Sequence, residues 1–190
     1  MSVLSVYTET MGATFELIAD DALKSEDASY YKECHYCDRV IQPVYRMDGF
    51  LVRSDGTVDE AHDGYVACEH CIKLGRAKWI LEEDMYPLIE AFVLEPDSQK
   101  RLLRRTPQIP NFAQRNDWTI CCGQLCEYTG HPESYEEAKM LSTSVQFWDL
   151  GPSKWSDIYK NYELTPAYLG EVNTFKCRVC SKCWFTWQCT

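Results

Sequence analysis

Two short motifs stand out in the first half of the chain, Cys34-His35-Tyr36-Cys37 and Cys68-Glu69-His70-Cys71, and 30 residues separate them. The two-residue gap in each C-x2-C pair lets both thiolates turn onto one tetrahedral ion, with Zn–S distances of about 2.3 Å. Two such pairs complete a shell of four thiolates without an open position, as in structural zinc sites. We therefore predict a first zinc site, in a module of the treble-clef or zinc-ribbon kind, formed by Cys34, Cys37, Cys68 and Cys71.

The second half carries a less regular set of cysteines, Cys121-Cys122-Gly123-Gln124-Leu125-Cys126 and Cys177-Arg178-Val179-Cys180. Cys121 competes with Cys122 as a ligand, and Cys183 competes with Cys177 or Cys180, because Cys180 and Cys183 also have C-x2-C spacing. The glycine that follows Cys122 favours Cys122, since tight turns at such sites suit a residue without Cβ strain. The sequence thus predicts two zinc ions per chain and leaves Cys121, Cys183 and Cys189 spare. The second set of ligands is predicted to be Cys122, Cys126, Cys177 and Cys180.

The composition indicates a folded protein of a reducing compartment. The chain has 190 residues, of which 45% are hydrophobic, which suits one domain or two lobes, 1–95 with the first site and 96–190 with the second. Neither a signal peptide nor an apolar run of the roughly 18 residues of a membrane span is visible. We expect a cytoplasmic protein without membrane contact, in which most of the eleven cysteines serve metal binding rather than disulfides.

The pattern along the chain predicts an α+β fold with short hairpins and several helices. Residues 39–52 indicate two strands with a turn at Met47-Asp48-Gly49, and Ser54-Asp55-Gly56 indicates another turn. A helix is expected after Cys71, with Ile72, Ala77, Ile80 and Leu81 on one face. Further strands are expected at 3–7 and within 174–189, and further helices at 84–94, 97–105, 132–141 and 152–162.

The charge points away from nucleic acid and toward a basic protein partner. The formal net charge is −10, whereas domains that grip a phosphate backbone are usually basic. No Lys or Arg lies between Trp79 and Gln99. The same segment is either a solvated face or a docking surface for a basic partner. Its acidic residues are Glu82, Glu83, Asp84, Glu90, Glu95 and Asp97.

A set of motifs spanning roughly residues 15–185 resembles the CbrC family of bacterial proteins. These motifs are Arg105-Thr106-Pro107, then Phe112, Gln114 and Trp118, then Cys122-Gly123, Cys126 and Gly130, and finally Phe175-Lys176-Cys177-Arg178-Val179-Cys180. The doubled Cys121-Cys122 and the extra Cys183 and Cys189 depart from the family pattern. The name-giving member is associated with tolerance to a colicin, so the resemblance implies an immunity-type role beside a bacterial toxin.

Three function classes follow from these observations. The first is a zinc-binding immunity protein that neutralises a basic toxin domain. The second is a zinc-ribbon adaptor that contacts nucleic acid or a regulatory protein, because Lys176, Arg178 and Lys182 lie among Phe175, Trp184 and Trp187. The third, an enzyme, is disfavoured, since closed four-thiolate shells are structural. The remaining histidines, His62 and His131, lie in no recognisable catalytic motif.

Overall fold

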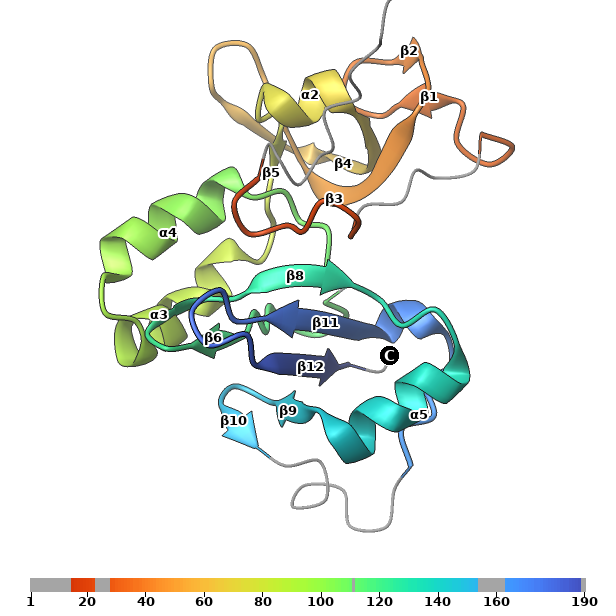
Figure 1. Cartoon of the computed structure of the whole chain (residues 1–190). Coiled ribbons are helices and arrows are strands. Elements are labelled where there is room, and N and C mark those ends of the chain that lie inside the picture. The colour runs from red at the N-terminus through yellow and green to blue at the C-terminus, as the bar shows by residue number, and fades with distance from the viewer. Residues whose placement is uncertain (1–14, 23–27, 111, 154–162, 189–190) are drawn as a thin grey trace, which may run out of the picture.

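The computed structural model describes residues 15–22, 28–110, 112–153 and 163–188 as a mixed α+β protein. Figure 1 shows the first strands and α2 at one end of the molecule, a larger sheet at the other, and α3 and α4 beside them. The α+β prediction is confirmed. None of the helices in these ranges is long and apolar enough to cross a membrane.

The first part of the chain forms a three-stranded antiparallel sheet with a small hairpin and a short helix. The strand order is β4-β3-β5, and β1 pairs with β2. The predicted turn at Ser54-Asp55-Gly56 is confirmed, because it joins β3 to β4. The bounds are β1 Glu33–Cys34, β2 Arg39–Val40, β3 Val44–Val52, β4 Val58–Cys68, α2 Glu69–Lys73 and β5 Ala77–Lys78.

Two local predictions in this part were wrong. Met47-Asp48-Gly49 is not a turn, because β3 continues through it and the pairing with β4 shifts register between Arg46 and Gly49. Such a bulge absorbs extra residues without ending the strand. The helix after Cys71 ends at Lys73, since Gly75 adopts a φ of +62° and the chain then enters β5 at Ala77.

The middle of the chain supplies short helices. Thr106, in extended conformation, ends α4 before Pro107, as predicted. The helix expected at 132–141 begins later, at Tyr135, and Ser134 caps it, because the Ser134 hydroxyl accepts a hydrogen bond from the backbone N–H of Glu137. The bounds are η1 Glu82–Met85, α3 Tyr86–Phe92, α4 Pro96–Arg105 and α5 Tyr135–Ser144.

The last part forms a five-stranded sheet in the order β10-β9-β12-β11-β8, next to a separate hairpin of β6 and β7. The strand expected within 174–189 is confirmed as the hairpin of β11 and β12. The helix expected at 152–162 begins as strand β10, and the rest of it lies outside the described residues, as does the strand expected at 3–7. The bounds are β6 Ile120–Cys121, β7 Gln124–Leu125, β8 Glu127–Gly130, β9 Gln146–Trp148, β10 Pro152–Ser153, η2 Leu169–Glu171, β11 Val172–Lys176 and β12 Cys183–Trp187.

Two main apolar cores underlie these parts. One surrounds the cysteines of the first motifs and includes Val44, Met47 and Val66. The other lies against the five-stranded sheet and includes Trp118, Tyr128 and other aromatic side chains. Trp79, Met85, Ile89 and Val93 also pack in this second core. The division of the chain into lobes remains a prediction.

Candidate metal centres

The first cluster brings together the four cysteines that the sequence predicted. The Sγ atoms of Cys34, Cys37, Cys68 and Cys71 all lie within 4.8 Å of one another. Four thiolates around a tetrahedral ion at 2.3 Å stand about 3.8 Å apart, and the Sγ atoms of Cys37 and Cys68 are 4.0 Å apart. This pair therefore has nearly the spacing that a metal ion imposes, and the other pairs lie within 4.8 Å.

A hairpin and a strand end position these ligands. Cys34 ends β1, and its carbonyl accepts a hydrogen bond from the N–H of Asp38 at 2.8 Å, which closes a tight knuckle. Asp38 has a φ of +54°, a conformation that aspartate tolerates better than most residues. Cys68 ends β4 and caps α2, and its N–H donates to the Cys34 sulfur at 3.2 Å. Such N–H···S bonds stabilise a thiolate.

Tyr36 anchors the first knuckle from inside. Its side chain is buried, and its hydroxyl lies 2.9 Å from the carbonyl oxygens of both Gly49 and Gly64. A Cβ on Gly64 would stand 2.6 Å from the Tyr36 ring, so the strand needs glycine there. Burial, followed by the nearby carboxylates of Asp48 and Asp63, raises the pKa of Tyr36, and the phenol stays protonated. The knuckle is thus fixed to both β3 and β4.

The second cluster differs from the predicted set by one residue. The structure brings together the Sγ atoms of Cys121, Cys122, Cys177 and Cys180 within 4.8 Å. Cys121 Sγ stands 3.9 Å from that of Cys122 and 3.7 Å from that of Cys180, again close to tetrahedral spacing. Cys126, which was predicted as a ligand, is not part of this cluster. Cys121 takes its place as the fourth sulfur.

Hairpin geometry explains the exchange of Cys121 for Cys126. Cys122 and Gly123, with φ of +52° and +74°, form the two-residue turn between β6 and β7, as in type I′ hairpins. Cys121 and Cys122 therefore lie at the tip, whereas Cys126 lies beyond the end of β7, where its N–H bonds to the carbonyl of Thr119. Burial raises the pKa of the Cys126 thiol to about 12, so it packs as a protonated core side chain.

The Cys177–Cys180 knuckle repeats the backbone of the first knuckle. The N–H of Ser181 donates to the Cys177 carbonyl at 2.9 Å, and Ser181 has a φ of +59°, matching Asp38 after Cys37. A hydrogen bond from the backbone of Lys182 is the main reason that the pKa of Cys180 falls to about 7. Cys183 begins β12 and is exposed outside the cluster, and Cys189 lies outside the described residues.

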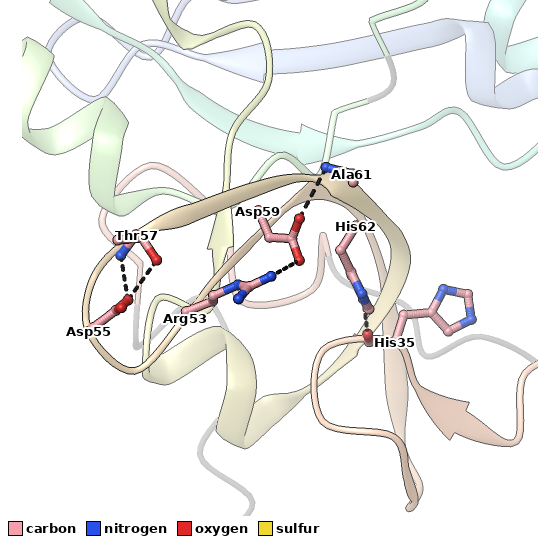
Figure 2. A network of polar contacts seen from close by, with 7 residues as sticks. All are labelled: His35, Arg53, Asp55, Thr57, Asp59, Ala61 and His62. Atoms are coloured by element: carbon pink, nitrogen blue, oxygen red, sulfur yellow. Dashed lines mark hydrogen bonds and ion pairs between the residues drawn. The ribbon is translucent and has the colours of Figure 1, made fainter.

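His62 and His131, the two histidines outside the cysteine motifs, each contact a backbone carbonyl group. Figure 2 shows His62 turned toward the first knuckle, where Nε2 lies 2.6 Å from the carbonyl oxygen of His35. His131 lines a cavity of about 670 Å³, with Nδ1 2.8 Å from the Val172 carbonyl oxygen and Nε2 3.0 Å from the Tyr128 hydroxyl. Both rings thus support local structure.

Polar contacts also hold the β3–β4 hairpin near its turn. The carboxylate of Asp55 accepts hydrogen bonds from the backbone and hydroxyl of Thr57, at 2.9 and 2.7 Å. Arg53 pairs with Asp59 at 2.7 Å (Figure 2). These polar groups are paired with one another by hydrogen bonds and an ion pair, and we assign them a structural role.

Two four-cysteine clusters on an α+β scaffold define a class of protein that could bind two metal ions. Each cluster offers four sulfurs and no open position, as in structural metal sites. The sequence model of the Uncharacterised protein family (UPF0167) matches residues 19–189, and the chain belongs to this family. No curated protein and no solved structure gives a match.

Proposed function

We propose that the protein binds two zinc ions and uses the stapled scaffold to bind another protein. The observation that supports zinc most strongly is the spacing of the sulfurs, which lie within 4.8 Å of one another in each cluster, with Cys37 and Cys68 4.0 Å apart in the first and Cys121 3.7 Å from Cys180 in the second. Thiolates select soft or borderline ions, and four of them in a closed tetrahedral shell are typical of structural zinc. A closed shell supports binding rather than catalysis.

Metal content tests the first half of this proposal. Protein purified under reducing conditions without a metal-affinity tag is expected to contain about two zinc ions per chain, because four thiolates surround each site. Elemental analysis together with native mass spectrometry measures the number directly. Metal-free protein in which all thiols react with a thiol reagent would overturn the proposal.

We further propose that the partner is a basic toxin domain, so that the protein acts as an immunity protein. The support is the resemblance to the CbrC family together with the net charge of −10. An acidic surface speeds the encounter with a basic partner and covers a cleft made for an anionic substrate. A scaffold cross-linked by metal also loses little conformational freedom on binding.

Part of the acidic segment is already neutralised within the molecule. Glu82 is only 8% exposed and lies 3.9 Å from Arg104, and Glu90 pairs with Lys100. Desolvation raises the pKa of Glu82, so lysine at this position would be buried at a cost. The acids exposed for a partner in this segment include Glu83, Asp84, Glu95 and Asp97.

Charge reversal at Glu83 and Asp84 tests the docking surface without disturbing the core. A Glu83→Lys/Asp84→Lys variant is expected to fold normally and to bind the toxin about tenfold more slowly, with a weaker salt dependence. The measurements are association kinetics and survival of cells that co-express the toxin encoded beside this chain's gene. Asp20→Lys/Asp21→Lys is the control, with the same change of charge at another exposed site. Full protection by the first variant removes η1 from the interface, and no protection by the unmodified protein removes the immunity role.

The second candidate, an adaptor that stacks nucleic acid bases, has less support. Phe175 and Trp184, which were expected to offer stacking faces, are 1% and 3% exposed in the core. Lys182 covers the Trp184 ring at 4.6 Å, and Arg178 pairs with Glu16. These aromatic rings therefore serve packing, which favours a protein partner over nucleic acid.

A further inference from the structure

The two clusters face solvent very differently. In the first, Cys34, Cys68 and Cys71 are between 0 and 3% exposed, and Cys37 is half-buried. In the second, Cys122 and Cys180 are exposed and Cys121 is half-buried. Only Cys177 is buried there, with 1% of its surface exposed. A competing ligand therefore meets two exposed sulfurs at the second cluster, whereas three of the four sulfurs of the first cluster are buried.

The first cluster is also part of the core around it. Three of its four cysteines belong to an apolar cluster with Val44, Val66 and Ile72. The Tyr36 hydroxyl, 2.9 to 3.1 Å from three carbonyl oxygens of β3 and β4, closes the knuckle from within. An ion held there leaves only when this core opens.

The second cluster instead sits at the tips of two hairpins whose bases have their own core. Behind the tips, Trp118 packs against Phe175 with ring centroids 5.5 Å apart, and Trp148 packs against Trp184 at 5.7 Å. Of the four cluster cysteines, only Cys177 lies among the buried residues of this core. Apolar burial of this kind stabilises the sheet without help from an ion.

We propose that the second cluster is an exchangeable zinc site, which loads and unloads while the protein stays folded, whereas the first cluster retains its ion. This inference rests on the proposed zinc binding and assigns a different role to each site. Zinc has no geometric preference from d-electrons, so an incoming ligand can bind on the exposed side of Cys122 and Cys180 before a thiolate leaves. The ion departs as Zn²⁺ with the incoming ligand, and the released thiolates take up protons from water without any redox change.

Unloading would alter a surface next to the cluster. Leu94 is 84% exposed, its N–H donates to the Gly123 carbonyl at 3.0 Å, and its side chain lies against the Cα side of Gly123. Gly123 belongs to the hairpin tip that an ion would tie to the Cys177–Cys180 knuckle. Occupancy of the second site would therefore affect how firmly the exposed, apolar Leu94 is held next to the hairpin tip.

Timed chelation of the zinc-loaded full chain tests the proposal. With excess EDTA and a phosphine reductant, native mass spectrometry is expected to show loss of one of two zinc ions while the circular dichroism spectrum stays unchanged. The second ion should leave only when denaturant unfolds the chain. Loss of both ions together at the rate of unfolding, or of neither ion from the folded protein, would overturn the inference. Protein that never contained zinc would overturn the proposed zinc binding instead.

Two matched variants assign the exchanging ion. Cys122→Ser, which alters an exposed ligand, is expected to fold with one tightly held zinc and to lose the fast phase of release. Cys183→Ser, which alters an exposed thiol outside the cluster, should keep both ions and both phases. A fast phase that persists in Cys122→Ser would contradict the assignment. If that variant fails to fold, the release kinetics of the unmodified protein still decide between the outcomes.

Discussion

Replacing Cys71 with serine is expected to remove one zinc ion and to abolish cooperative folding of the first part of the chain. Cys71 is 1% exposed within the core around the first cluster, and a serine hydroxyl does not replace a thiolate as a zinc ligand. Zinc binding in small sites contributes about 10–16 kcal/mol, which equals or exceeds the roughly 5–15 kcal/mol of net stability of a typical domain. The soluble fraction, the zinc content and urea unfolding measure the effect.

Cys183→Ser is the matched control, because this thiol is exposed and lies outside both clusters. It should leave solubility, zinc content and the unfolding midpoint nearly unchanged. A soluble Cys71→Ser protein that keeps two zinc ions and unfolds like the unmodified chain would show that the first cluster does not hold the fold.

A second large effect, on the pH dependence of the free energy of unfolding, is expected from Asp117. Its carboxyl group is 2% exposed beside the second core. Burial raises its pKa to about 7, and the nearby carboxylate of Asp149 adds to the rise. The N–H of Leu150, 3.1 Å from Oδ1, together with Arg115 and Trp148, only partly offsets this rise. The folded protein therefore holds a proton on Asp117 at a pH at which the unfolded chain has released it.

The sign of the pH dependence follows directly from this difference. Below pH 4 the Asp117 carboxyl is protonated in both the folded and the unfolded state, so it does not change the free energy of unfolding. Between pH 4 and 7 only the unfolded state ionises, so this group lowers the free energy of unfolding by up to about 4 kcal/mol as the pH rises. Above pH 7 Asp117 is ionised in both states, and the free energy of unfolding falls no further. Asp117→Asn is expected to remove this loss, because the amide is neutral and its oxygen still accepts the Leu150 N–H.

Urea unfolding of the unmodified protein and Asp117→Asn at pH 5 and pH 8 checks the expectation. The variant should gain stability relative to the unmodified protein at pH 8, and the gain should shrink at pH 5. Comparing both proteins at the same pH cancels the pH dependence of metal binding. Asp20→Asn is the control, since Asp20 is exposed and is not among the groups that shift the pKa of Asp117. An equal stability difference at both values of pH would contradict the assignment.

The sequence was most informative where a few neighbouring residues decide the local structure. The C-x2-C spacing is sufficient to predict that Cys34 and Cys37 face one point, and the turn at Ser54-Asp55-Gly56 depends on its own residues alone. Helix α4 also followed from local signals, with Pro96 at its start and Thr106-Pro107 at its end. The Met47-Asp48-Gly49 turn failed because pairing with β4 outweighs local turn preference.

By itself, therefore, the sequence determined that this is an α+β protein with two four-cysteine clusters, and it identified seven of the eight clustered sulfurs. Only the tertiary structure decided that Cys121 takes the place of Cys126, that Glu82 is buried, and that Phe175 and Trp184 serve the core. The physical reason is that the spacing of residues along the sequence determines the direction of their side chains only within a single turn or knuckle. A metal centre brings together sulfurs from distant segments, here within 4.8 Å, and burial depends on every element packed around a side chain.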